Sequence, residues 1–220
     1  MTNCALVTGR GKRAIADHFD ISYELEHQIS GSSKEALLGS IRDVIDQGIF
    51  TMVRQREMLG LGHAVLTGEP LIGPEPFGMV LSDDLCLNTG GPSVLAQMAQ
   101  LFEEFGCSIV AVQEVPDEDI HNYGVIAGDQ LRDGIYRVER MVEKPKAEDA
   151  PSNLAVIGRY ILSPKVLNNL NKMKQGAGGE IQLTDAIAQE IGGDESVYGY
   201  RFRGQRYDCG SKAGFLQATV

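Results

Sequence analysis

The sequence has no tryptophan and no long apolar run. A helix that crosses a bilayer needs about 20 consecutive apolar residues, and no segment approaches that length. The N-terminal segment turns basic at Arg10 to Arg13 before the apolar core of a signal peptide could form. These absences exclude a membrane as partner and predict a cytoplasmic protein.

Cysteines are few and scattered. Cys4, Cys86, Cys107 and Cys209 include no pair with the C-x-x-C spacing of a zinc site or redox motif. Small disulfide-stapled domains carry cysteines at a much higher density. We therefore expect reduced, buried thiols and neither a zinc site nor a disulfide framework.

Basic residues are also scarce, with 20 Lys and Arg against 30 Asp and Glu and a net charge of −10. Proteins that bind a nucleic-acid backbone usually present a basic patch, so the charge argues against nucleic acid as partner. A small phosphorylated ligand needs only a few local cations. The composition is therefore compatible with a nucleotide.

What is present is an alternation of apolar strands and amphipathic helices within 220 residues. After residue 122 the segments at 123–128, 134–144 and 155–162 are strand-like without full helices between them. The pattern predicts an α/β protein with a parallel or mostly parallel sheet, helices on both faces and a mixed or β-rich part. The first half is expected to form strands at 4–8, 49–55, 77–84 and 107–115, and helices at 12–29, 32–48, 62–71 and 92–106; the second half adds helices at 163–173, 180–191 and 211–220 and a strand at 196–204.

Two adjacent acids end the predicted strand 77–84. Ligands of open α/β sheets bind outside the carboxyl ends of strands, and Mg²⁺ prefers one or two carboxylates plus substrate phosphates. Asp83 and Asp84 are therefore candidate metal or ligand residues. The alternative is a solvated turn with a helix cap.

A second group of charges lies in the segment MVEKPKAEDAPSN. The apolar strand delivers Glu143 and Lys144, and Pro145 then ends the pairing. The lysine could neutralise a phosphoryl group, and the acid could bind a sugar hydroxyl. The alternative is again a solvated turn.

Four further positions carry weaker signals. Glu180 follows a glycine loop and either binds a ligand or favours a helix dipole. Asp208 is either a second metal carboxylate or an N-cap. Gln55, at a strand end, could read a base edge or lie on the surface, and His63 in the following loop is expected to pack or cap.

The order of these motifs resembles that of the bacterial UTP–glucose-1-phosphate uridylyltransferase family. The resemblance covers almost the whole chain and is most specific between residues 142 and 163. The motifs that carry it are HFDISYELE, VRQ…GLGHAVL, LSDDL, YGV, VEKPKAEDAPSNLAVIGRYILS, GGEIQLTDAI and YDCGSKAGFLQA.

The resemblance implies one nucleotidyltransferase domain over residues 1–220. Its fold would be Rossmann-like, the nucleotide-diphospho-sugar transferase fold, with a mixed, mostly parallel sheet flanked by helices. Such enzymes convert UTP and glucose 1-phosphate to UDP-glucose and pyrophosphate by Mg²⁺-assisted in-line attack on the α-phosphorus.

The resemblance also implies a role for each site residue. Lys144, which would contact the sugar phosphate, and Asp83 would be catalytic, and Asp83 and Asp208 would hold Mg²⁺. On the nucleotide side, Gln55 and Gly60 would face the uracil, and Asp84 would lie behind the metal ligands or on the ribose side. Glucose would be bound by Gly124, Glu143 and Glu180.

The chain departs from the family pattern at its start. The family holds the triphosphate with a G-x-G-T-R signature after its first strand, whereas CALVTGRGKR matches the second strand and its turn. We therefore expect Gly9 and Gly11 to be turn glycines, the first strand to be missing and two strand edges to be exposed. The helix that carries subunit contacts in the family is also expected to be missing, so the domain would be incomplete at both ends, and a homo-oligomer is an open alternative.

Two other functions stay open. One is a non-catalytic remnant that binds sugar nucleotides or associates with subunits. The other is transfer of a different nucleotide, such as thymidylyl transfer.

Overall fold

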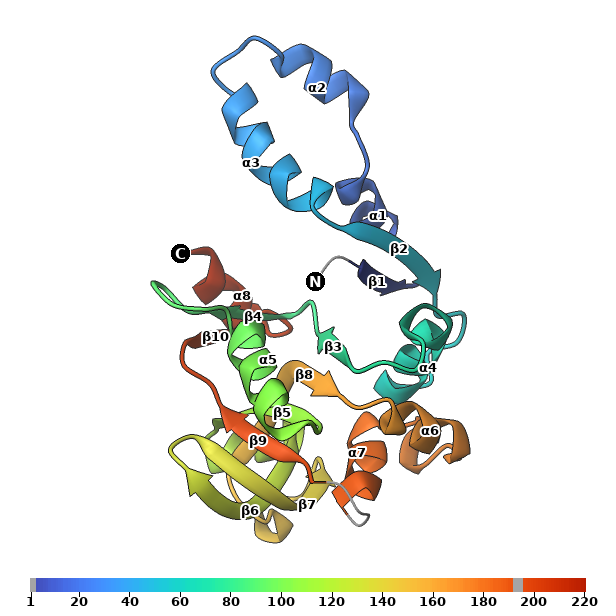
Figure 1. Ribbon diagram of the computed structural model, residues 1–220, viewed down its shortest axis with the longest axis vertical. Coiled ribbons are helices and arrows are strands. Elements are labelled where there is room, and N and C mark those ends of the chain that lie inside the picture. Colours follow the sequence, from blue (N-terminus) through green and yellow to red (C-terminus); the bar gives the residue numbers. More distant parts are fainter. Residues whose placement is uncertain (1–2, 192–195) are drawn as a thin grey trace.

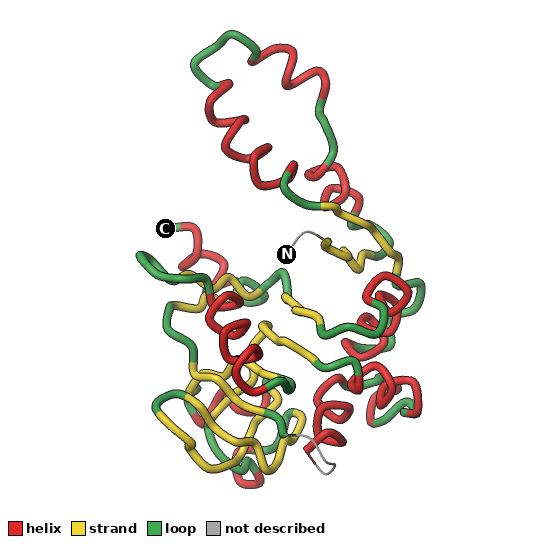
Figure 2. The backbone as a smooth tube through the Cα atoms, viewed as in Figure 1, coloured by secondary structure: helices red, strands yellow, loops and turns green. Residues whose placement is uncertain are grey.

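The computed structural model describes residues 3–191 and 196–220. Its N-terminal part pairs β1 (Asn3–Thr8) in parallel with β2 (Ile49–Arg54). Between them run α1 (Arg13–Phe19), α2 (Tyr23–Ile29) and α3 (Glu35–Asp46). These helices project away from the rest of the molecule (Figures 1 and 2).

The expected helix over 12–29 is wrong, because the chain forms two short helices there. Asp20 adopts an extended conformation after α1, and α2 begins after Ser22. Neither helix contains a buried residue, so no packed face holds the two segments in one helix. The turn before them is as expected, since Lys12 N donates to the carbonyl of Gly9 and Gly11 has a positive φ of 82°.

The core of the molecule is a six-stranded sheet with strand order β3-β8-β5-β9-β7-β6, in which β6 also pairs with β8. A separate short pair joins β4 to β10. The strands are β3 (Phe77–Val80), β4 (Asp84–Leu87), β5 (Ile109–Glu114), β6 (Gly124–Arg132), β7 (Ile135–Glu143), β8 (Leu154–Leu162), β9 (Tyr198–Arg201) and β10 (Gln205–Asp208).

The sheet is mixed, as expected, but it is not mostly parallel. Within it only β5 and β9 pair in parallel among the described residues, and β8 runs antiparallel to β3, β5 and β6. The reason is that β6, β7 and β8 follow one another without the crossover helices that parallel neighbours require. The strand expected over 77–84 is also divided, because Ser82 and Asp83 form a turn between β3 and β4.

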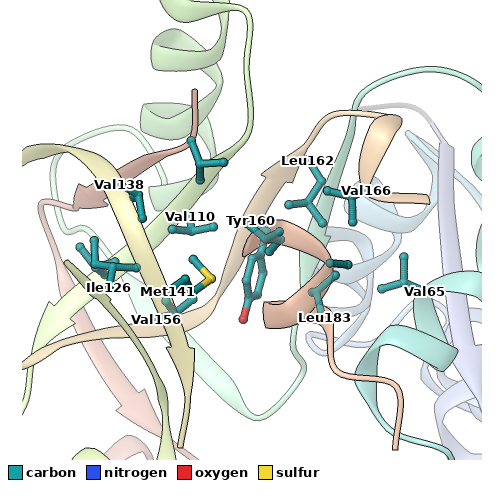
Figure 3. Close-up of a cluster of buried hydrophobic side chains, with 14 of the residues drawn as sticks. Val65, Val110, Ile126, Val138, Met141, Val156, Tyr160, Leu162, Val166 and Leu183 are labelled. Carbon is teal, nitrogen blue, oxygen red and sulfur yellow. The ribbon is translucent and has the colours of Figure 1, made fainter. Parts of the chain in front are cut away.

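Helices cover both faces of this sheet (Figure 1). Alternate residues of β5 enter different cores: Val110 and Val112 join the cluster shown in Figure 3, whereas Ile109 and Ala111 join the cluster beneath α5. The helices are α4 (Leu61–Ile72), α5 (Val94–Phe105), α6 (Lys165–Lys172), α7 (Leu183–Ile191) and α8 (Lys212–Thr219), with 3₁₀ turns at Asp117–Asn122, Ala147–Asp149 and Ala177–Gly179.

The cysteines are free thiols, as expected, but only Cys107 of the four is buried. In the described part of the chain, no helix combines the length and apolarity that crossing a membrane demands.

Candidate active site

An open cleft of about 430 Å³ lies where the ends of β3, β7 and β10 meet the starts of α4, α7 and β6. All of the predicted site residues except Gln55 line it. They are Gly60, Asp83, Asp84, Gly124, Glu143, Lys144, Glu180 and Asp208. The fold thus brings together side chains from across most of the chain, as the strand-end argument predicts.

Asp83 and Asp208 both approach Gly210 with a carboxylate oxygen. A Cβ built on this glycine would lie 3.3 Å from Oδ2 of Asp83 and 3.1 Å from Oδ1 of Asp208. The absence of a side chain there leaves a space flanked by two carboxylates at the cleft. The expected alternative for Asp208, an N-cap, does not apply, because Ser211 caps α8 with a hydrogen bond from Gly214 N.

This pair of carboxylates fits the donor set of Mg²⁺, which takes one or two carboxylates and completes its shell with phosphate oxygens and water. In residues 3–191 and 196–220 no group of three or more His, Cys, Asp or Glu converges on a metal-sized space. A pair of carboxylates leaves most of the coordination shell of such an ion to phosphate oxygens and water.

Asp84 is buried, and both of its carboxylate oxygens are occupied within the chain. Oδ2 accepts from Gly158 N at 2.6 Å, and Oδ1 accepts from Nε of Arg206 at 2.5 Å. Asp84 therefore holds Gly158 and Arg206 in place at the cleft, and its expected place behind the metal ligands or on the ribose side stays a prediction.

Arg206 connects this buried acid to Asp208. Its Nη2 lies 3.5 Å from Oδ2 of Asp208, and its guanidinium stacks 5.2 Å from the ring centre of Tyr123. The Tyr123 hydroxyl donates to the same Oδ2 at 3.2 Å. Burial lowers the pKa of Arg206, but the hydrogen bond with Tyr123 and the attraction of Asp84 outweigh it and raise the pKa overall. Arg206 is thus a permanent cation beneath the cleft.

Glu143 and Gly124 face the first turn of α7. Thr184 Oγ1 donates to Oε2 of Glu143 at 2.6 Å. A Cβ on Gly124 would lie 3.1 Å from that same Oε2 and 3.2 Å from the Thr184 hydroxyl, so this glycine keeps the carboxylate accessible. The nearby Tyr160 is neutral, because burial and then the charges of Glu143 and Asp84 raise its pKa.

Lys144 has a φ of 42° and is the one non-glycine with positive φ among the residues that the structure describes. Its backbone N–H donates to the carbonyl of Tyr123 at 3.0 Å, which holds the turn before Pro145. The side chain is 57% exposed, and its Nζ lies 4.0 Å from Oε1 of Glu143. Strained backbone of this kind concentrates at functional sites, and here it presents an ammonium group to the cleft.

Gly60 and Glu180 meet at the opposite wall. Gly60 has a φ of 90°, and a Cβ there would lie 2.9 Å from Cβ of Glu180, so only glycine fits. Backbone hydrogen bonds between residues 59–62 and Ile181 lock the two loops together. The Glu180 carboxylate accepts from Nε2 of Gln182 at 2.8 Å.

Gln55 lies beside the cleft. Its Nε2 donates to the carbonyl of Gly60 at 3.2 Å and lies 3.0 Å from Nδ1 of His63. The structure thus assigns His63 a contact with a predicted site residue, beyond packing or capping.

Sequence reasoning missed several residues that line the cleft or support it. Thr184 stands inside the motif that contains Glu180, and Arg206 stands directly before the motif that contains Asp208; these positions are the signals that could have found them. Tyr123, Tyr160 and Thr184 line the cleft together with Arg206.

The fold and this site define a nucleotidyltransferase: a family model described as nucleotidyl transferase matches residues 29–220, and the chain belongs to that class. It is 58% identical over 219 residues to a UTP–glucose-1-phosphate uridylyltransferase of Pseudomonas aeruginosa, covering 100% of this chain and 78% of that relative. A relative with the same name from Staphylococcus epidermidis is 45% identical and covers 98% of this chain and 74% of its own length. The chain therefore belongs to the UTP–glucose-1-phosphate uridylyltransferase family.

Solved structures agree with this assignment. A crystal structure of apo UDP-glucose pyrophosphorylase has a TM-score of 0.94 and 52% identity and covers 99% of this chain and 80% of its own. A UDP-glucose pyrophosphorylase in complex with UDP-glucose has a TM-score of 0.91 and 50% identity, with 99% and 79% coverage. A thymidylyltransferase from Bacillus anthracis, at 18% identity and a TM-score of 0.65, shares the fold alone.

Proposed function

We propose that this chain converts UTP and glucose 1-phosphate to UDP-glucose and pyrophosphate. The observation that carries the proposal is one cleft that holds a carboxylate pair, Asp83 and Asp208, together with a strained, exposed Lys144. The names of the similar uridylyltransferases and of the UDP-glucose complex support the choice of substrates.

In the proposed reaction a phosphate oxygen of glucose 1-phosphate attacks the α-phosphorus of UTP. The new P–O bond forms as the bond to the β-phosphate breaks, and pyrophosphate leaves without a covalent enzyme intermediate. Asp83 and Asp208 would hold Mg²⁺, which when bound offsets negative charge on the phosphate oxygens. The protein otherwise contributes positioning and charge neutralisation.

The residues of the cleft would each contact a different part of the two substrates. Lys144 would neutralise the sugar phosphate, and Glu143, oriented by Thr184, would accept a hydrogen bond from a glucose hydroxyl. Gly124 and Glu180 would complete the sugar side of the cleft. Gln55 and Gly60 would face the uracil.

The first test is pyrophosphate release by the purified chain with UTP, glucose 1-phosphate and Mg²⁺. Turnover that falls by at least 100-fold in Lys144→Ala and is retained in Lys146→Ala would support the proposal. Lys146 is a suitable control because its side chain is 80% exposed and lies outside the cleft lining. Binding of UDP-glucose without any turnover would contradict it and favour the non-catalytic alternative.

Replacement of UTP by dTTP in the same assay tests the nucleotide. Faster turnover with dTTP would contradict uridylyl transfer. Cell fractionation and size-exclusion chromatography test the expected cytoplasmic location and the homo-oligomer that the family resemblance leaves open.

A further inference from the structure

The amide of Gln55 is held in one orientation by two groups of the loop and helix that follow it. Its Nε2 lies 3.2 Å from the carbonyl oxygen of Gly60 and 3.0 Å from Nδ1 of His63. The backbone N–H of Gln55 donates to the carbonyl of Thr8 at 2.8 Å, so the residue is fixed at the end of β2.

These contacts determine which end of the amide points away. A carbonyl oxygen only accepts, so the Gln55 atom that faces Gly60 is the NH₂ group. This NH₂ group only donates, so Nδ1 of His63 is the acceptor of its second hydrogen in this contact. Within the described chain, Oε1 of Gln55 has no hydrogen-bond partner and is not a buried, unsatisfied atom.

We propose that His63 is a positioning residue that fixes the amide of Gln55 so that the enzyme selects a pyrimidine with an N–H at position 3. Uracil carries that N–H, and Oε1 of Gln55 accepts it. Cytosine has a lone pair at N3, which the same oxygen repels. The inference rests on the proposed contact between Gln55 and the base. It adds His63 as the group that makes Oε1 of Gln55, and not its NH₂ group, the atom that faces the base.

Two substitutions of His63 with side chains of similar shape distinguish the effect of its hydrogen-bond acceptor from the effect of its volume. In His63→Asn, Oδ1 takes the branch position of Nδ1 and still accepts from Gln55; in His63→Leu, a methyl group takes that position. The measurement is calorimetric titration of the full chain with UTP and with CTP in the presence of Mg²⁺. We expect the ratio of UTP to CTP affinity to fall about tenfold in His63→Leu and to stay near the wild-type value in His63→Asn.

Thr67→Val is the control for disturbance of α4. The Thr67 hydroxyl donates to the backbone carbonyl of His63 at 2.8 Å, and it forms no hydrogen bond with the imidazole within the described residues. This variant should keep the wild-type ratio. If His63→Leu does not fold, His63→Phe keeps the ring without the acceptor and serves the same comparison.

Gln55→Ala separates failure of the inference from failure of the proposed function. If Gln55→Ala lowers the ratio and His63→Leu does not, or if His63→Asn lowers it as much as His63→Leu, the role of His63 is wrong and the base contact stands. If the wild-type chain does not distinguish UTP from CTP, or does not bind UTP, the proposed base contact is wrong, and the inference is overturned with it.

Discussion

Nε of Arg206 donates to Oδ1 of Asp84 at 2.5 Å, and the two side chains are only 9% and 7% exposed. This ion pair joins β10, which ends at the proposed metal ligand Asp208, to β4, which begins directly after the proposed ligand Asp83. The same guanidinium lies 3.5 Å from Asp208. The buried Asp84 carboxylate therefore acts on Asp208 through the guanidinium group of Arg206.

Removal of that cation should destabilise the fold strongly. We expect Arg206→Met to lower the free energy of unfolding by about 3–5 kcal/mol, because it leaves the buried Asp84 carboxylate unpaired. Urea unfolding measures the change. The control is Arg201→Met, whose exposed ion pair with Glu114 should contribute less than about 1 kcal/mol. Equal losses of unfolding free energy in Arg206→Met and Arg201→Met would contradict the expected difference between a buried and an exposed ion pair.

The hydroxyl of Tyr123 should influence metal affinity. It donates to Oδ2 of Asp208 and accepts from Nη1 of Arg206 at 3.3 Å. Tyr123→Phe frees the carboxylate to turn, so we expect the Mg²⁺ concentration for half-maximal UTP binding to rise about tenfold. Calorimetry at a series of Mg²⁺ concentrations tests this. Tyr23→Phe, on exposed α2, should cause no shift, and an unchanged Mg²⁺ dependence in Tyr123→Phe would refute the role.

The backbone of Lys144 predicts that stability and activity change in opposite directions. Glycine adopts a φ of 42° without the steric cost that other residues bear, so Lys144→Gly should raise the free energy of unfolding by about 1 kcal/mol. The same variant should lose turnover, because the ammonium group is gone. Denaturant unfolding and the pyrophosphate assay together measure both effects.

Lys146→Gly is the matched control for the backbone effect. Lys146 has a φ of −65°, where glycine relieves no strain, so this variant should not be stabilised. Equal stabilisation by both glycines, or none by Lys144→Gly, would show that the conformation of Lys144 carries no strain.

Tyr160 predicts a loss of stability in alkali. Burial raises its pKa in the folded state, whereas in the unfolded chain it titrates near the ordinary value of about 10. The contribution of neutral Tyr160 to the free energy of unfolding is therefore complete below about pH 10. It is lost as the pH rises further, by at most about 1.4 kcal/mol per pH unit. Unfolding free energies from about pH 8 to about pH 11 should fall more steeply in the wild type than in Tyr160→Phe. Parallel curves would contradict this assignment.

Much of the site could be anticipated from local pattern. Asp83 stands where an apolar strand ends, and Glu143 and Lys144 stand where proline stops another. The carboxyl ends of strands gather at sheet edges, so these residues lie on one cleft. Resemblance to a family supplied Gly124, and it gave a sugar-binding role to Glu180, for which local pattern gave only a weak signal.

Other parts of the site depend on contacts between residues far apart in the chain. Arg206 and Asp84 are 122 residues apart, and no periodicity relates them. Likewise, the local sequence around His63 does not indicate its contact with Gln55, because the loop after β2 brings the amide and the imidazole together. Such pairings follow from chain closure and from the cost of leaving buried polar groups unpaired.

The sequence by itself determined the alternation of strands and helices, the turn at Gly9 and Gly11, and the acids at the ends of strands, because these depend on neighbours in the chain. Only the tertiary structure decided that β8 runs antiparallel within the sheet and that a buried arginine supports the cleft. It also decided which end of the Gln55 amide is free. These depend on which strands meet and which charges share one desolvated space, and local patterns of hydrophobicity carry no information about either.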